Sequence, residues 1–250
     1  MSPQGAERIA VIAQFSSTPR LSRSFSRLVG GLTELGYLVI VSSTTEGSAE
    51  LEWPDGRPAD VVVLRRPNIG YDFGSWAVVL NTIPGVRSAK FLLVMNDSLV
   101  GPFSSMAPIV ADFESAATPV WGAVRSYQFA PHLQSFFLGF RDGILESGPL
   151  RTFWSRISVE GTKTNVIWKY ELGLSALLRT VGIDSSSAFD GAGAVDGELN
   201  PSILGWRRLL ESGFPFVKRQ LLTEPQVAPD SSEVAAVVKE LFDEEVGEWL

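Results

Sequence analysis

Two short apolar runs of the sequence are each followed by residues that could bind a ligand. These residues are Asn68, Gly70, Asp72 and Gly74 after the run 61–64, and Asn96, Asp97 and Ser98 after the run 90–95. A short apolar run bounded by turn residues is typical of a buried parallel strand, and ligands of open α/β sheets bind at the carboxyl ends of such strands. Gly70 and Gly74 permit backbone conformations or a close approach that a side chain would forbid. We therefore expect both loops to contribute to one site.

Some of these side chains have a structural alternative. Asn68 and Asp72 could cap the helix that we expect to begin near Gly74, because both residue types bond to the free N–H groups of a first helical turn. A carboxylate directly after a buried strand is more often a ligand than a filler, which favours Asp97. Spacing alone thus leaves Asn68 and Asp72 open between two roles and makes Asp97 the stronger candidate.

Three further groups occur later in the chain, and each has a common non-catalytic explanation. His132 is the only histidine, and a lone histidine is usually structural or on the surface. Glu171 lies at the edge of an apolar helical stripe, where a single acid is usually solvated. The pair Lys218-Arg219 is expected to be an ordinary solvated pair.

Composition excludes several classes of protein. The chain has 250 residues, 45% of them hydrophobic, which is enough for a sizeable core in one domain or two small ones. The absence of cysteine rules out disulfides and thiolate metal sites, and it allows a cytoplasmic location. A formal net charge of -7 argues against a general nucleic-acid binder. The apolar run 9–13 is too short for a signal peptide, and no run approaches the roughly 20 apolar residues that span a bilayer.

Apolar periodicity and turn residues predict the elements that must position these groups. The pattern predicts strands at 8–15, 37–41, 61–64 and 90–95, with helices at 21–35 and 74–82 between them. Pro102 and Pro108 bracket another helix start, and strands at 120–124 and 134–140 follow. This alternation predicts an α/β fold with a mostly parallel sheet that becomes mixed and is flanked by helices.

After residue 141 the pattern is mainly helical. The segment 165–182 carries an apolar stripe near 100° per residue, with Thr164 or Asn165 as its cap and Gly182 as its stop. Glu171 lies about 60° from the centre of this stripe by helix geometry and can face a cleft. Residues 184–199 are rich in Ser, Gly and Asp and are expected to form a mobile loop or lid. We expect a short helix at 201–211, one domain over 1–222, and an acidic linker and helix over 223–250.

Several short motifs occur in an order that resembles one family. They are Asn68-Ile69-Gly70-Tyr71-Asp72-Phe73-Gly74, Asn96-Asp97-Ser98-Leu99-Val100-Gly101-Pro102, His132-Leu133-Gln134-Ser135-Phe136-Phe137, Tyr170-Glu171-Leu172-Gly173-Leu174-Ser175, Asn200-Pro201 with Trp206, and Gly213-Phe214-Pro215-Phe216-Val217-Lys218-Arg219. Together they cover residues 60–222, and the sequence resembles the rhamnan synthesis protein F family of polysaccharide-assembling glycosyltransferases. More distantly, the layout resembles the inverting glycosyltransferases of the GT-A fold.

The resemblance implies a nucleotide-sugar donor, with dTDP-rhamnose as the expected one, and a glycan or lipid-linked glycan acceptor. It implies transfer with inversion, by an enzyme in the cytoplasm or at the inner face of the membrane, alone or beside other glycan-assembly enzymes. The donor-binding residues would be Asn68, Gly70, Asp72, Asn96, Asp97, Ser98 and Gln134. The catalytic residues would be Glu171, as the general base, and His132.

Glycosyl transfer requires charge stabilisation on the leaving diphosphate and removal of a proton from the acceptor hydroxyl. A divalent cation, Mg²⁺ or Mn²⁺, held by Asp97 and the donor phosphates would meet the first need. The sequence departs from the family's Asp-x-Asp motif at this point, because Asn96-Asp97-Ser98 offers one carboxylate instead of two. The basic groups that could neutralise phosphate instead are Arg65, Arg66 and the pair Lys218-Arg219.

Two other function classes remain open. The single carboxylate of the Asn96-Asp97-Ser98 motif allows a non-catalytic partner in glycan assembly that keeps the fold and binds a nucleotide sugar or a glycan. A nucleotide-dependent enzyme of another kind is the weakest alternative, because no G-x-G-x-x-G follows the first strand and no Walker A sequence is present.

Overall fold

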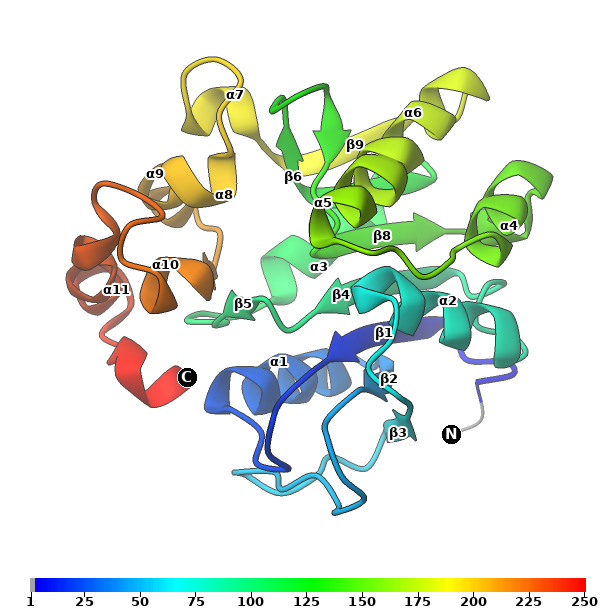
Figure 1. Ribbon diagram of the computed structural model, residues 1–250, viewed down its shortest axis with the longest axis horizontal. Coiled ribbons are helices and arrows are strands. Elements are labelled where there is room, and N and C mark those ends of the chain that lie inside the picture. Colours follow the sequence, from blue (N-terminus) through cyan, green and yellow to red (C-terminus); the bar gives the residue numbers. More distant parts are fainter. Residues whose placement is uncertain (1–2) are drawn as a thin grey trace.

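A computed structural model describes residues 3–250, and its centre is an eight-stranded sheet (Figure 1). The strands are β1 (Arg8–Gln14), β2 (Leu38–Ser43), β3 (Val61–Arg65), β4 (Phe91–Asn96), β6 (Val120–Ser126), β7 (His132–Leu133), β8 (Phe137–Arg141) and β9 (Ser185–Asp190). Their order is β3-β2-β1-β4-β8-β6-β7, and β9 pairs with β6. β1 to β4 are parallel, whereas β8 runs antiparallel to β4 and β6. The predicted mostly parallel sheet that becomes mixed is therefore confirmed.

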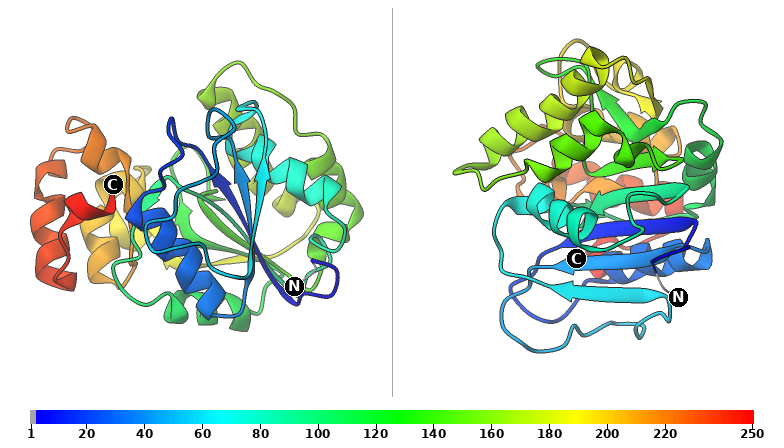
Figure 2. Two further views of the ribbon diagram at one scale, coloured as in Figure 1. Left: turned by 90° about the horizontal axis from the view of Figure 1, so that it is seen from below. Right: turned by 90° about the vertical axis from the view of Figure 1, so that its right-hand side faces the viewer.

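Helices cover both faces of this sheet (Figure 2). The α-helices of residues 3–250 are α1 (Arg23–Glu34), α2 (Tyr71–Thr82), α3 (Ala107–Ser115), α4 (Gly148–Ser155), α5 (Lys163–Val166), α6 (Gly173–Thr180), α7 (Gly191–Ala194), α8 (Pro201–Leu204), α9 (Trp206–Glu211), α10 (Gln220–Thr223) and α11 (Val234–Phe242). α1 and α3 pack on one face, and α2, α4 and α6 pack on the other. None of the helices within residues 3–250 combines the length and apolar character that crossing a membrane requires.

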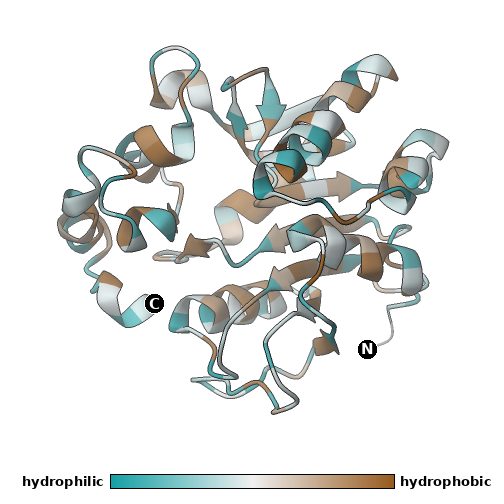
Figure 3. Ribbon diagram, viewed as in Figure 1, coloured by the Kyte–Doolittle hydropathy of each residue, from teal (hydrophilic) through white to brown (hydrophobic). Residues whose placement is uncertain are grey.

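The central strands are apolar on both sides because helices cover both faces. Along β1, Ala10 and Ile12 point into the core below α1 and α3, whereas Ile9 and Val11 point into the core below α2. Ile9 pairs with Leu38 of β2 and with Leu92 of β4, so β1 lies between two strands of the same kind. Colouring by hydropathy shows the apolar strands at the centre and polar residues along the connecting loops (Figure 3).

The helix after β3 begins at Tyr71, three residues earlier than predicted. Gly70 precedes it at φ +83°, a left-handed conformation that glycine adopts without a steric penalty. A Cβ on Gly74 would lie 2.8 Å from the carbonyl oxygen of Ile69, so this turn also requires the close approach that we expected. No side chain caps the helix.

The predicted helix 165–182 is three consecutive segments. α5 begins after Thr162, whose hydroxyl accepts a bond from the Asn165 N–H, so the cap is Thr162 and the predicted caps Thr164 and Asn165 are wrong. A π-helix, Ile167–Leu172, follows, and its wider turn places Val166 in the core where the stripe predicted Ile167. α6 ends before Gly182 at φ +69°, as predicted.

The lid predicted at 184–199 is wrong. Residues 185–190 are β9, which pairs in parallel with β6 and sets Ser186 beside Trp121 and Phe189 beside Val124. The serine-rich sequence carries little strand propensity, but the exposed edge of β6 supplies backbone partners. α7 follows directly, so most of the predicted loop is part of the folded sheet and its next helix.

The C-terminal part builds a third core. β5 (Leu99–Val100) and β10 (Val217–Lys218) form a separate antiparallel pair. Trp206, Val238 and Trp249 bury their side chains against Val100 and Phe103, so the last helices pack on the loop that follows β4. The predicted helix 201–211 is two short helices, α8 and α9, separated by Gly205.

Candidate active site

The carboxyl ends of β1 and β4 meet at one point of the sheet edge. The Phe15 N–H, directly after β1, donates a 2.8 Å bond to Oδ2 of Asp97, directly after β4. β2 and β3 lie on one side of β1 and β4 lies on the other, so the strand order reverses here. Such a reversal leaves a crevice in which open α/β sheets bind ligands.

A chain of hydrogen bonds ties four polar side chains together at this edge. Nδ2 of Asn96 donates a 2.7 Å bond to Oδ2 of Asp72, at the start of α2. Oδ1 of Asn96 accepts a 2.6 Å bond from the Ser98 hydroxyl, which in turn accepts a 3.1 Å bond from Nζ of Lys218. Asp72 therefore orients the side-chain amide of Asn96, and neither it nor Asn68 caps α2.

Lys218 and Arg219 belong to the site, and the expectation that they form a solvated pair is wrong. β10 pairs with β5 and sets Lys218 opposite Leu99, while the Arg219 N–H donates a 2.8 Å bond to the Ser98 carbonyl. Nζ of Lys218 also lies 4.0 Å from the centre of the Phe136 ring. Both basic side chains are only half-buried, with their charged ends beside the carboxyl end of β4.

Burial gives three of these groups unusual proton affinities. Burial raises the pKa of Asp97 to about 7, and the nearby carboxylate of Asp72 contributes to that rise. Burial also raises the pKa of Asp72, although the bond from Asn96 opposes the shift. Burial lowers the pKa of the Lys218 amine to about 8. Because each ionised form is poorly solvated here, a ligand of opposite charge would be favoured.

Glu171 is held by the segment that follows β7. The backbone N–H of Ser135 donates a 2.7 Å bond to Oε2 of Glu171, and the Ser135 hydroxyl bonds to the same oxygen. The second oxygen, Oε1, faces Nε2 of His132 at 3.7 Å. Nδ1 of His132 lies 2.8 Å from the Ala130 carbonyl, which fixes the ring. Glu171 is thus an oriented carboxylate whose side chain is 17% exposed, and His132 is its buried neighbour.

Gln134 carries an unused acceptor in the same place. Its side chain is 5% exposed, and its Nε2 donates a 3.0 Å bond to Oδ1 of Asn200. Oε1 of Gln134 is buried and has no hydrogen-bond partner among the residues described. A buried acceptor without a partner is costly, so a donor such as a ligand hydroxyl would stabilise this arrangement.

One pocket of about 480 Å³ collects these groups. Of the predicted site residues, those that line it are Asp72, Asn96, Asp97, Ser98, Gln134 and Glu171. His132 reaches it only through its contact with Glu171. Ser135, Lys163 and Asn200 are among the other residues that line it, and sequence reasoning assigned no role to them. Ser135 and Asn200 both belong to motifs that resemble the family, so the sequence did contain an indication that these two residues are functional.

Asn68 and Gly70 lie outside this pocket. Asn68 lines a separate shallow hollow with Arg65 and Arg66. Nη2 of Arg65 donates to the carbonyls of Thr45 and Gly47, and the guanidinium of Arg66 bonds to Ser75. These two arginines therefore hold loops together, which makes them weaker phosphate candidates than Lys218 and Arg219.

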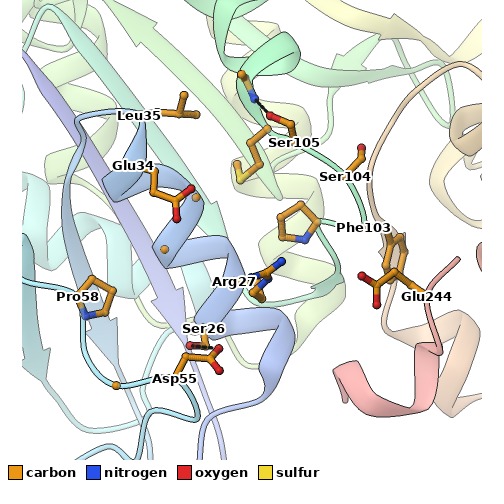
Figure 4. Close-up of a pocket in the computed structure, with 16 residues that line it drawn as sticks. Ser26, Arg27, Glu34, Leu35, Asp55, Pro58, Phe103, Ser104, Ser105 and Glu244 are labelled. Carbon is orange, nitrogen blue, oxygen red and sulfur yellow. Dashed lines mark hydrogen bonds between the residues drawn. The ribbon is translucent and has the colours of Figure 1, made fainter. Parts of the chain in front are cut away.

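Two further hollows adjoin α1. One, of about 860 Å³, shares Phe15, Asp97 and Arg219 with the main pocket and extends along residues 14–23. The other, of about 500 Å³, is shown in Figure 4 and holds none of the predicted site residues. Arg27 of α1 lies there among three acidic side chains, those of Glu34, Asp55 and Glu244.

A divalent cation fits part of the main pocket. Mg²⁺ in proteins is commonly held by one or two carboxylates together with substrate phosphates. Asp97 and Asp72 supply two carboxylates, each with one oxygen already bonded to the protein. Within residues 3–250, no group of three His, Cys, Asp or Glu side chains could hold a metal ion. A cation here would therefore take its remaining ligands from donor phosphates and water.

Comparison with known proteins identifies the family. The family model described as rhamnan synthesis protein F matches residues 40–246, most of the chain and all of the pocket residues except Phe15. The chain belongs to the rhamnan synthesis protein F family. The match includes the motifs at Asn68, Asn96 and Glu171 on which the resemblance depends.

Two relatives show how far the family similarity extends. Virulence protein VirA of Vibrio anguillarum (strain ATCC 68554 / 775) is 29% identical over 198 residues, which cover 65% of this chain and 62% of that protein. The uncharacterized protein y4gN of Sinorhizobium fredii (strain NBRC 101917 / NGR234) is 26% identical over 133 residues, 51% of this chain and 35% of that protein. The chain thus spans less than two thirds of the length of either relative.

Among solved structures, the crystal structure of the glycosyltransferase GlyE of Streptococcus pneumoniae TIGR4 matches with a TM-score of 0.40. The two sequences are 10% identical, and the match covers 73% of this chain and 45% of that chain.

Proposed function

We propose that the protein is a glycosyltransferase that moves a sugar from a nucleotide-sugar donor to a glycan or lipid-linked glycan in polysaccharide assembly. Membership of the rhamnan synthesis protein F family supports this function. The observation that carries it is that one pocket holds both groups suited to binding a diphosphate and a carboxylate suited to accepting a proton. Asp97, Lys218 and Arg219 gather where a diphosphate could bind, and the oriented carboxylate of Glu171 lines the same pocket.

The diphosphate would lie beside Lys218 and Arg219. Burial lowers the pKa of the Lys218 amine because its charged form is poorly solvated there. A bound phosphate would stabilise the charged form and keep Lys218 protonated. A bound Mg²⁺ or Mn²⁺ ion, held by Asp97 and Asp72, would neutralise charge on the leaving phosphate. The nucleoside would then extend into the adjoining hollow along residues 14–23, where Phe15 offers an exposed ring for stacking.

Glu171 would act on the acceptor. Its carboxylate takes the proton of the acceptor hydroxyl as the oxygen forms a bond to the anomeric carbon, and the bond to the diphosphate breaks with its electron pair passing to the phosphate oxygen. Ser135 holds Oε2, which leaves Oε1 for this proton. Attack on the face of the sugar opposite the leaving group would invert the anomeric carbon. The unpaired Oε1 of Gln134 would accept a hydroxyl of a bound sugar.

A thermal-shift screen of nucleotide sugars, with and without Mg²⁺ or Mn²⁺, tests the donor site, because a ligand that binds the native state raises its stability. We expect dTDP-rhamnose to give the largest shift and a divalent cation to increase it. A subsequent assay with glycan acceptors tests transfer. If donors stabilise the protein but no acceptor is glycosylated, a non-catalytic partner in glycan assembly would be favoured. The single carboxylate of Asn96-Asp97-Ser98 is the observation that supports this alternative.

A further inference from the structure

Two aromatic rings form an isolated pair on the surface. Phe129 is 57% exposed and Trp168 is 54% exposed, and their ring centroids lie 5.1 Å apart with an interplanar angle of 39°. Contact between the two rings buries only part of each, so a broad apolar face remains in water. Large side chains of this kind more often lie in the core or at a binding surface.

The backbone that carries Phe129 is strained. Phe129 sits at φ +66° in the turn between β6 and β7. For a bulky residue this left-handed conformation is an outlier, and a glycine would occupy it without a steric penalty. A strained residue that also exposes its ring points to a function at that position, because neither feature helps the protein to fold.

The pair lies on the two segments that build the candidate base. Trp168 belongs to the π-helix Ile167–Leu172, which also carries Glu171. The turn of Phe129 leads directly into His132, whose ring faces Glu171 at 3.7 Å. Neither Phe129 nor Trp168 lines the pocket itself, whereas Ile167 does. The pair therefore lies outside the pocket, on segments that carry Ile167 and Glu171 of its lining and His132, which contacts Glu171.

We propose that Phe129 and Trp168 form a stacking platform for a sugar ring of the acceptor glycan, at least one residue away from the hydroxyl that is glycosylated. The proposal rests on the glycosyltransferase function proposed above. A pyranose ring presents an apolar C–H face that matches the negative face of an aromatic ring, while its hydroxyls point outward. The side-chain amide of Gln128, next to Phe129 in the chain, would bond to those hydroxyls, whereas the amine of Lys169 already pairs with Glu160.

The size of the pair favours a sugar over a protein. A stable protein interface buries about 800 Å² on each partner, far more than two rings can supply. Each ring has one polar neighbour along the chain, Gln128 or Lys169, and one half-buried apolar neighbour, Ala130 or Ile167, so no second exposed large apolar side chain adjoins either ring in the sequence. One or two sugar rings have the area of this platform.

Fluorescence tests the contact independently of transfer. Of the seven tryptophans, Trp168 is the one that is more than half exposed, so a collisional quencher such as acrylamide reports mainly on it. We expect linear trisaccharides of rhamnose, glucose or N-acetylglucosamine at millimolar concentration to protect the quenchable fraction. Trp168→Phe should remove that fraction, and Phe129→Ala should retain it but weaken protection about tenfold.

Kinetics test the role of the platform in transfer. Trp168→Leu and Phe129→Ala should raise the acceptor KM about tenfold or more while donor binding stays unchanged, and Trp168→Phe should keep a near-normal KM because it keeps an aromatic face. Leu241→Ala on α11, where Leu241 is also exposed, is the matched control and should change neither the acceptor KM nor donor binding.

The outcomes separate the two proposals. Unchanged acceptor KM in both variants, or an equal loss of donor binding, would overturn the platform while leaving the glycosyltransferase intact. If the wild-type protein neither binds a donor nor transfers a sugar, the proposed function fails, and protection of Trp168 by a trisaccharide still decides whether the pair binds glycan. Absence of protection by all three trisaccharides would overturn the platform.

Discussion

Nζ of Lys218 lies 3.1 Å from the hydroxyl of Ser98, although 120 positions separate the two residues in the chain. The contact joins the strand-end motif of β4 to the short strand β10. Further bonds through Ser98 and Asn96 connect the Lys218 amine to the carboxylate of Asp72. The C-terminal part of the chain is therefore a component of the candidate donor site.

Lys218→Met should weaken donor binding about 10- to 100-fold, because a hydrogen bond to a charged group is worth roughly 1.5–3 kcal/mol. Lys218→Arg should lose less, since it keeps the charge. Lys239→Met is the matched control, because Lys239 pairs with Asp243 on the surface of α11. Isothermal titration with dTDP-rhamnose measures the effect, and equal affinity of the Lys218→Met variant and the control would place the diphosphate elsewhere.

Asp97→Asn should abolish transfer and any gain in donor binding from Mg²⁺ or Mn²⁺ while leaving the fold intact. The amide keeps the size of the carboxylate but cannot carry its charge. Asp72→Asn should weaken donor binding most, because it disturbs the Asn96 amide that Asp72 orients. Paired titrations with and without the cation check both variants, and full activity in either would remove that residue from the site.

Stability should fall as the pH rises from about 4 to 7. The folded protein retains the proton of Asp97 up to a pKa of about 7, whereas the unfolded chain releases it near 4, so deprotonation favours the unfolded chain in this range. Asp72 shifts in the same direction. Urea unfolding at pH 5 and pH 8 should show a lower free energy of unfolding at pH 8, and Asp97→Asn should shrink that difference. An identical difference in the variant would show that Asp97 ionises normally.

The strand-end site was predictable from sequence because its signals are local. Short apolar runs marked β3 and β4, and Asp72 from the segment after β3 meets Asn96 at the end of β4 in the structure. Gly70 and Gly74 were predicted for their backbone, and both meet that need. Glu171 was found from helical spacing together with the family motif.

The rest depends on contacts that no local pattern encodes. Lys218 reaches the site because the two-residue strand β10 pairs with β5. Nothing in the local sequence Lys218-Arg219 indicates that this segment forms a strand or which strand it pairs with. β9 was missed because its serines have low strand propensity and the edge of β6 decides the outcome. The π-helix was missed because a period of 100° per residue describes an α-helix.

Amides of residues 186–189 should exchange slowly in the free protein. As part of β9 they are hydrogen-bonded to β6, and Phe189 packs on the core next to Phe214. Hydrogen exchange followed by mass spectrometry measures this directly, with the exposed segment 196–199 as the internal comparison. Rapid exchange of residues 186–189 without a ligand would restore the mobile loop that the composition suggested.

The turnover of the Glu171→Gln variant is the sharpest test of Glu171 as the general base. The amide preserves the shape and the bonds from Ser135 but cannot take a proton from the acceptor. A general base contributes typically 10²–10⁴-fold, so turnover should fall by that factor while donor affinity and the melting temperature stay unchanged. His132→Ala, run in parallel, should cost less, because His132 acts through Glu171. Near-normal turnover of Glu171→Gln would contradict the assignment of this carboxylate as the base.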